Sequence, residues 1–151
     1  MPHRGSNHQT VKQLNRGLVL KLISTGICQT RVALARQTRM SKMTITNIIA
    51  ELVESGYLEE SYPPLLPGKR RNVIEIDISP HAPKILGVYV SRSKCAVVLM
   101  DLKMQCLKYL VETLSNETAD TLTQRIVRLL REILPVKERV IGIGVSIIGH
   151  Y

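Results

Sequence analysis

The first fifty residues combine a strong basic charge with the apolar spacing of helices. They contain no Asp or Glu and eight basic residues, namely Arg4, Lys12, Arg16, Lys21, Arg31, Arg36, Arg39 and Lys42. A disordered basic tail would lack the recurrence of apolar residues at every third or fourth position, so we expect this stretch to fold. A folded cationic surface attracts polyanions, and nucleic acid is the first candidate.

The charge and the sequence pattern both divide the chain. Residues 1–84 hold twelve basic and six acidic groups, a net charge of +6, whereas residues 85–151 hold nine and six, a net charge of +3. The pattern changes near the Pro-rich residues 79–83. We therefore predict two domains, residues 1–79 and 84–151, with the polyanion bound by the first. Domains this small bury little surface, so each is expected to be stabilised by contact with the other domain or with a second subunit.

Cysteine and histidine usage argues against a metal site or a disulfide framework. The three cysteines, Cys28, Cys95 and Cys106, make an odd count without short spacing. We expect them to be small buried side chains rather than nucleophiles or ligands. The histidines share no ligand spacing; they are His3, His8, His81 and His150. No cofactor and no metal are expected.

Composition also bears on compartment and on the kind of nucleic acid. The longest late apolar run, residues 140–148, is too short to cross a bilayer, and no secretory signal pattern opens the chain. We expect a cytoplasmic protein without membrane contact. Phe and Trp are absent and only five Tyr are present, which removes the usual stacking platforms for single strands. Double-stranded DNA is therefore favoured.

Apolar spacing predicts three helices in the first domain. The first spans residues 11–24 and ends at Thr25-Gly26; its expected inward residues are Leu14, Leu18, Leu22, Val19 and Ile23. The second spans residues 30–37, with Thr30 as its cap; its expected inward residues are Val32, Leu34 and Ala35. The third begins after the cap Ser41 and ends at Ser55-Gly56; its expected inward residues are Ile45, Ile48, Ile49 and Leu52.

The second and third helices with their short turn fit a helix-turn-helix motif. The small Ala35 would let the two helices approach closely, and the apolar Met40 lies at the turn. Arg39 stands where such motifs usually place Gly, and a left-handed backbone there would cost a non-Gly residue roughly 1 kcal/mol. The exposed face of the third helix carries short or flexible hydrogen-bonding groups instead of the usual Glu/Lys mixture; these are Lys42, Thr44, Thr46 and Asn47.

A basic loop follows the third helix. Residues 57–60 and the alternating residues 73–78 are predicted strands, and between them lie a Pro/Gly segment and three consecutive cations, Lys69, Arg70 and Arg71. Taken alone, the cations fit a solvated charged loop. Their position after the motif favours the wing of a winged helix-turn-helix, which places them beside the groove next to the third helix.

The second half has a different rhythm. Three short strands are predicted over residues 85–90, 96–100 and 106–111, a helix over residues 119–134 and a fourth strand over residues 140–148. The inward face of the helix is expected to hold Leu122, Ile126, Leu129, Leu130 and Ile133. Arg125, Arg128 and Arg131 mark its outer face and are expected to be solvated. This β-β-β-α-β order predicts an α/β sheet with one helical layer.

The chain resembles the ROK family of sugar-responsive repressors and sugar kinases along nearly its whole length. Residues 30–35, 40–46 and 52–60 look like the winged helix of the repressor branch, residues 68–71 look like its basic wing, and residues 85–88 look like the opening of its actin-like domain. The resemblance implies an α+β winged helix-turn-helix domain followed by a partial α/β domain that is actin-like, or ribonuclease H-like. It also implies a repressor of sugar-metabolism genes.

The resemblance further implies that kinase chemistry has been lost. In the family's kinases the first strand leads into an Asp followed one residue later by Gly-Gly-Thr-Lys, where backbone amides approach ATP phosphates. Here Tyr89 replaces the Asp, both glycines are missing, and only Ser93-Lys94 is similar. Such a cradle cannot form easily around the Cβ-bearing Ser91 and Arg92. No enzyme activity and no ATP binding are expected.

The family's catalytic Asp, sugar-binding residues and Cys/His zinc cluster follow a strand that residues 141–149 resemble. The sequence thus resembles a family member truncated within the first lobe of the actin-like domain. It is compatible with a fragment, a degenerate gene product or a short regulator without sugar sensing, and a sugar effector is doubtful because the part that would bind it is missing.

The leading hypothesis is a sequence-specific repressor that binds a palindromic operator as a homodimer. Its expected DNA-binding residues are Thr30, Arg31, Ser41, Lys42, Thr44, Thr46, Asn47, Lys69, Arg70 and Arg71. Ser41 and the helix amino terminus would hold a phosphate, the polar face would meet base edges, and Arg31 with the wing would fix register. The alternatives are a dimerisation module and a degenerate sugar-kinase remnant without catalysis.

Overall fold

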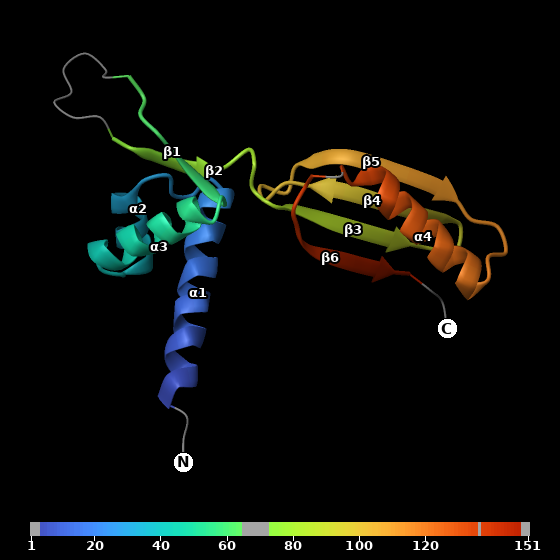
Figure 1. The fold of residues 1–151 in the computed structure, drawn as a ribbon, viewed down its shortest axis with the longest axis horizontal. Coiled ribbons are helices and arrows are strands. Elements are labelled where there is room, and N and C mark those ends of the chain that lie inside the picture. Colours follow the sequence, from blue (N-terminus) through green and yellow to red (C-terminus); the bar gives the residue numbers. More distant parts are fainter. Residues whose placement is uncertain (1–3, 65–72, 136, 149–151) are drawn as a thin grey trace. The chain divides into compact units, whose positions relative to one another are not determined.

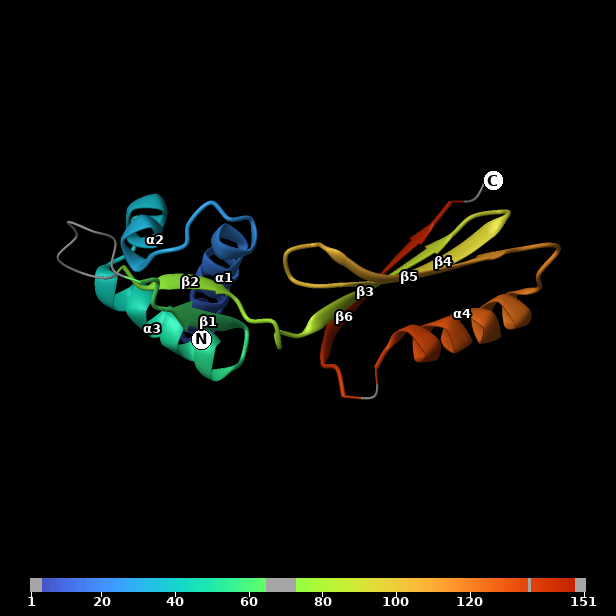
Figure 2. The same ribbon diagram turned by 90° about the horizontal axis from the view of Figure 1, so that it is seen from above.

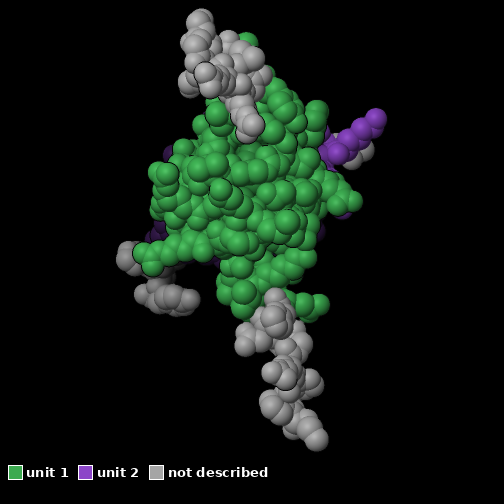
Figure 3. All heavy atoms as spheres, turned by 90° about the vertical axis from the view of Figure 1, so that its left-hand side faces the viewer, with its two compact units in different colours: residues 1–81 green, residues 82–151 purple. Residues whose placement is uncertain are grey.

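The structure, a computed structural model, describes residues 4–64, 73–135 and 137–148. The chain divides into two compact units, residues 1–81 and residues 82–151, which are coloured separately in Figure 3. Each unit has its own sheet. Within the described residues, no helix is long and apolar enough to cross a membrane.

The first unit packs three helices against a two-stranded antiparallel sheet (Figure 1). The helices are α1 (Arg4–Ser24), α2 (Arg31–Thr38) and α3 (Lys42–Glu54), and the strands are β1 (Leu58–Ser61) and β2 (Glu75–Ile78). Leu58 pairs with Ile78, and Ser61 pairs with Glu75. The hairpin therefore starts right after α3.

Both short helices begin with the predicted caps. The Thr30 hydroxyl accepts a hydrogen bond from the Ala33 amide at 3.2 Å, and the Ser41 hydroxyl accepts one from the Thr44 amide at 3.1 Å. Helix α3 ends as its sequence predicts, because Gly56 takes a positive φ of 72° and the Tyr57 amide bonds to the Leu52 carbonyl at 2.8 Å. These ends fix the lengths of both helices.

The core of the first unit is built around α3. Four of its residues, Ile45, Ile48, Ile49 and Leu52, are buried as predicted. Side chains on the other elements of the unit are likewise fully or almost fully buried, namely Val19, Ile23, Leu34 and Ile76. The opposite side of α3 is thereby left toward solvent.

Helix α1 differs from its prediction in length and in its inward face. It begins at Arg4, seven residues before the predicted start, because the polar residues 4–10 carry no apolar period that could reveal a helix. Leu14 is 67% exposed and Leu18 is 42% exposed. The prediction that these two leucines line the core is wrong: Val19, Leu22 and Ile23 do so, and the amino-terminal turns of α1 extend beyond α2, α3 and the hairpin (Figure 1).

The inward face of α2 also differs in part. Leu34 is fully buried and Ala35 is half-buried, but Val32 is 62% exposed, so its predicted inward position is wrong. A helix of eight residues has only two turns, and its single buried residue is Leu34. Periodicity over so short a segment leaves the angular position of the core uncertain.

The second unit is a four-stranded sheet covered on one face by one helix (Figure 2). The strands are β3 (Lys84–Val90), β4 (Lys94–Met100), β5 (Cys106–Thr113) and β6 (Val140–Ile147), and the helix is α4 (Ala119–Ile133). The sheet order is β5-β4-β3-β6; β6 runs parallel to β3, and the other neighbours are antiparallel. The β-β-β-α-β order along the chain is as predicted.

All five predicted inward residues of α4 pack on the sheet. Leu129 and Ile133 are buried against Leu86, Val88 and Val97, and the remaining three contact the same core. Ion pairs between side chains join α4 to β5. Arg125 binds Glu112 of β5 at 2.8 Å and Glu117 at 2.7 Å, and Arg128 also binds Glu112. Arg125 is thus half-buried between two carboxylates instead of solvated, whereas Arg128 and Arg131 are exposed, as predicted for the outer face.

The three cysteines are free, and two of them are buried. Cys28 and Cys95 lie in the core as predicted, and burial raises the pKa of the Cys95 thiol, with a smaller contribution from Glu112. Cys106 is exposed, contrary to the prediction, because it begins β5 at the edge of the sheet. Within the described residues, no three His, Cys, Asp or Glu side chains gather where they could hold a metal ion.

The turn between α2 and α3 generates the first testable prediction. Arg39 takes φ 59° and ψ 18°, the left-handed conformation that favours Gly. We expect Arg39→Gly to raise the free energy of unfolding by up to about 1 kcal/mol by relieving this strain. The matched control Arg36→Gly, inside helix α2, should lower it by about 1 kcal/mol. Urea unfolding of both variants tests this; equal destabilisation by both would contradict the strain.

Candidate nucleic-acid interface

The outward side of α3 lies opposite its isoleucines. Lys42, Thr46 and Asn47 are exposed on it, as the sequence predicts. Neither the Lys42 ammonium nor the Asn47 amide makes a hydrogen bond or ion pair with the described part of the chain. Both groups are thus available to an external partner.

The hydroxyl groups of the same segment are engaged within the helix. Besides capping Thr44, the Ser41 hydroxyl lies 2.8 Å from the Thr44 hydroxyl. The Thr46 hydroxyl donates to the Lys42 carbonyl at 2.9 Å. Four polar side chains are predicted to face base edges. Of these, Thr44 is half-buried, and the Thr46 hydroxyl already donates its hydrogen bond within the helix. Lys42 and Asn47 are the two whose polar groups are uncommitted.

The acidic residue in the middle of α3 is held by cations from α1. Glu51 binds the Lys12 ammonium at 2.7 Å, and the Arg16 guanidinium lies 3.7 Å from its other oxygen. The hydrogen bond from Lys12 is the main cause of a lowered pKa of Glu51. The amino-terminal half of α1 therefore contacts α3 through the polar residues Lys12 and Arg16 and not through the predicted leucine stripe. It also neutralises a carboxylate close to Asn47.

A groove runs between α1 and α3 beside this cluster. It has a volume of about 320 Å³, and it is lined by Val11, Lys12, Asn15, Thr44, Asn47, Ile48 and Glu51. Asn47 therefore lies at the boundary between the outward side of α3 and a wall formed by α1, on which Lys12 is paired with Glu51. The sequence did not reveal this wall, since Lys12 and Glu51 are 39 residues apart.

Arg31 has a partner that the sequence did not predict. Its guanidinium binds the Glu60 carboxylate, so it joins the start of α2 to β1. The sequence predicts that Arg31 contacts DNA phosphates, whereas in the structure its guanidinium is paired with the Glu60 carboxylate. It is therefore placed to orient the hairpin relative to α2. Thr30 is engaged as the cap of α2.

The three predicted wing cations, Lys69, Arg70 and Arg71, lie outside the described residues. The strands on either side of them are described, and their pairing ends at Ser61 and Glu75.

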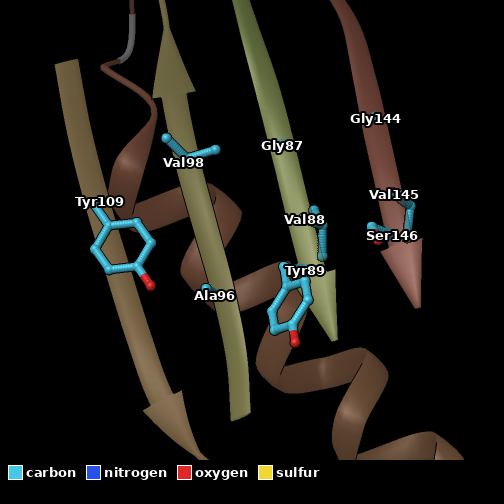
Figure 4. A pocket seen from close by; sticks show the side chains of 9 residues that line it. All are labelled: Gly87, Val88, Tyr89, Ala96, Val98, Tyr109, Gly144, Val145 and Ser146. Carbon is cyan, nitrogen blue, oxygen red and sulfur yellow. The ribbon is translucent and has the colours of Figure 1, made fainter. Parts of the chain in front are cut away.

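The second unit presents a different surface on the sheet face opposite α4. A shallow depression of about 480 Å³ lies there (Figure 4). Its lining is mostly apolar and consists of Gly87, Val88, Tyr89, Ala96, Val98, Tyr109, Gly144, Val145 and Ser146. Gly87 has no room for a side chain, because an added Cβ would lie 2.7 Å from the Val98 Cγ1. The aromatic rings of Tyr89 and Tyr109 stand on β3 and β5 at this face.

The turn after β3 is closed on itself. The Ser91 amide donates to the Lys94 carbonyl at 2.8 Å, and the Lys94 amide donates to the Ser91 hydroxyl at 3.1 Å. These two amides are therefore used within the turn and are not directed at a ligand. The geometry adds no support for a phosphate cradle at Ser93-Lys94.

The chain matches known transcriptional regulators. A xylose repressor of Caldicellulosiruptor bescii is 24% identical over 151 aligned residues, which cover 95% of this chain and 37% of that protein. The DNA-binding transcriptional dual regulator NagC of Escherichia coli is 26% identical over 133 residues, which cover 88% of this chain and 32% of that protein. No protein-family model matches the chain.

A solved structure shares the fold. It is the crystal structure of a ROK family transcriptional regulator, a homologue of the E. coli MLC protein, and it matches with a TM-score of 0.67 and 21% identity. The match covers 92% of this chain and 36% of that one. The chain thus spans about a third of the length of the proteins that it matches.

The cluster around Glu51 generates the second testable prediction. Since the folded pKa of Glu51 is lowered, its ionised form stabilises the fold above the unfolded pKa, and this stabilisation is lost as pH falls below about 4.5. We expect Glu51→Gln to lower the melting temperature at pH 7 and to have a smaller effect at pH 3. The matched control Glu54→Gln, on the exposed end of α3, should change little at either pH. A Glu51→Gln effect that stays constant with pH would contradict the ion pairs.

Proposed function

We propose that this chain, which resembles the repressor branch of the ROK family, is a sequence-specific double-stranded DNA-binding regulator that represses sugar-metabolism genes. One observation carries the proposal. The amino-terminal half of α3 presents Lys42 and Asn47 with uncommitted polar groups, on a unit that holds eleven Lys and Arg against six Asp and Glu. A cationic surface with a rigid helix is what the major groove accepts.

In this proposal residues 1–79 act as a winged helix-turn-helix. Helix α3 enters the major groove with its amino end, and the isoleucines behind it hold its rotation. The backbone amides of Lys42 and Met43 have no acceptor among the described residues, so a phosphate can bind them at the positive end of the helix. Ser41 contributes as the cap that orders these amides, since its hydroxyl is already used by Thr44.

The hairpin would supply the contacts outside the groove. Lys69, Arg70 and Arg71 would bind phosphates of the neighbouring groove, with no demand on base sequence. Arg31 would act by holding β1 through Glu60 and thereby fixing the direction in which the hairpin leaves the helices. Residues 84–151 would be the partial actin-like domain. We assign no enzyme activity to it, because the matched relatives are named as repressors and regulators.

A homodimer on a palindromic operator is the assembly we propose. Two recognition helices on one face of B-DNA need to be roughly 34 Å apart, a spacing that two-fold symmetry supplies. The second unit offers surface for self-association, because Ile141, Ile143, Val145 and Ile147 of the edge strand β6 are all exposed. Sedimentation showing a monomer both free and on a palindromic duplex would contradict this assembly.

The third testable prediction concerns salt. Selection from a random pool of duplexes should enrich a defined sequence. The logarithm of its binding constant should fall linearly with the logarithm of salt concentration, by about 0.9 per phosphate contacted. Titrations between 50 and 200 mM salt, on the order of the range in which such contacts are lost, measure the slope. Binding that stays flat as salt rises, or a pool without enrichment, would contradict the proposed function.

The fourth testable prediction separates base reading from phosphate binding. Asn47→Ala should cost about 1 to 3 kcal/mol on the selected duplex and relax the preference at the base pair it contacts. Arg70→Ala should weaken all duplexes alike and reduce the salt slope by about 0.9. Competition assays with single-base variants of the duplex distinguish the two. An Arg70→Ala variant with altered base preference would contradict the proposed role of the wing.

A further inference from the structure

The outward face of α3 carries exposed apolar side chains beside its polar ones. Met43 is 69% exposed, and Asn47 and Ala50, also exposed, follow it at i+4 and i+7 on the same side of the helix. The four buried residues of α3 lie on the opposite side. Two polar residues singled out by the sequence, Lys42 and Thr46, lie beside this line on one side, whereas the sequence pattern does not single out Met43 and Ala50.

The surroundings of Met43 leave few polar groups at the centre of this face. The hydroxyls of Ser41, Thr44 and Thr46 take part in hydrogen bonds within the helix. The Asn47 side chain is the one uncommitted hydrogen-bonding group on the line from Met43 to Ala50 in the described structure. The face thus offers a methyl group, an amide and a second methyl group in succession.

Charge limits what can cover this face. The amino end of α3 carries Lys42 and the positive end of the helix dipole. Glu51 is neutralised by Lys12 and Arg16, and the next carboxylate, Glu54, is at the carboxyl end of the helix. A polyanion can therefore approach the first turns of α3 without meeting an unpaired carboxylate there. An apolar protein partner would gain nothing from this distribution of charge.

Within the major groove, an apolar methyl group and an Asn amide can both recognise an A·T base pair, the first through its thymine and the second through its adenine. The thymine C5-methyl is the apolar group of the groove, and it is contacted by apolar side chains. Adenine presents an acceptor and a donor that match the Asn amide. Side chains at i and i+4 lie about 5 to 6 Å apart, and bases are stacked about 3.4 Å apart, so Met43 and Asn47 reach the same or adjacent base pairs.

We propose that Met43 and Ala50 contact thymine methyl groups while Asn47 reads an adenine, so that the central base pairs of each half-site are A·T. This inference rests on the proposed function and assigns a specificity to it. Met43 and Ala50 are then specificity-determining residues that act through apolar contact. Lys42 contributes affinity at the edge of the contact.

Replacement of thymine by deoxyuridine tests the inference, because it removes the C5-methyl and keeps every hydrogen-bonding group of the base. The probe is the duplex selected by the full chain from a random pool, together with versions that carry one deoxyuridine at each thymine position. At one or two central positions the replacement should weaken binding of the wild type about threefold to fivefold, the effect of one buried methyl group.

The protein variants complete the cycle. Met43→Ala should weaken binding to the thymine duplex by a similar factor and should be insensitive to deoxyuridine at its own position. Since the Met43 side chain is exposed, the melting temperature of the Met43→Ala variant should equal that of the wild type. Met104→Ala is the matched control, because Met104 is 65% exposed but lies in a turn of the second unit; it should bind like the wild type on every probe.

The outcomes separate the two proposals. If the chain enriches no duplex and shows no salt-dependent binding, the proposed function fails. If it binds a selected duplex with the expected salt slope but Met43→Ala and deoxyuridine act additively at every position, the inference about Met43 is overturned and the proposed function stands. A central G·C pair bound by Asn47, detected as loss of preference in Asn47→Ala, would also overturn it.

Discussion

Burial of the isoleucine stripe of α3 is the interaction on which the first unit depends. Ile45 and Ile49 are fully buried, and α3 packs against α1, α2 and β1. This packing sets the length of the turn before α3, the direction of the hairpin after it and, above all, the rotation of α3 about its own axis. A helix whose rotation is fixed presents the same side chains to every partner, which is the condition for sequence-specific contact.

Ion pairs add a second level of order at the edges of that core. The pair formed by Arg31 and Glu60 joins α2 to the hairpin, and the cluster of Lys12, Arg16 and Glu51 joins α1 to α3. Each links residues that are far apart in sequence, and each includes a cation that contributes to the positive charge of the first half. Part of the charge that attracts a polyanion therefore also positions the elements that would contact it.

The second unit shows the same principle with a different outcome. Its core forms where α4 packs on one face of the sheet, and the ion pair between Arg125 and Glu112 joins α4 to the edge strand β5. The other face holds Gly87 and Tyr109 around a shallow apolar depression, and β6 is exposed from Ile141 to Ile147. The order of the elements could be predicted from strand alternation and from one strongly amphipathic helix, because both patterns are local.

The sequence by itself determined the helix caps at Thr30 and Ser41, the buried stripe of α3 and the order of strands, since each depends on neighbours within a few residues along the chain. Tertiary structure alone decided which side of α1 faces inward, the partner of Arg31 and the exposure of Met43 on the outward face. The physical reason is that an amphipathic pattern reports that a face is buried, whereas its exact angle and its ionic partners depend on elements that meet only after folding.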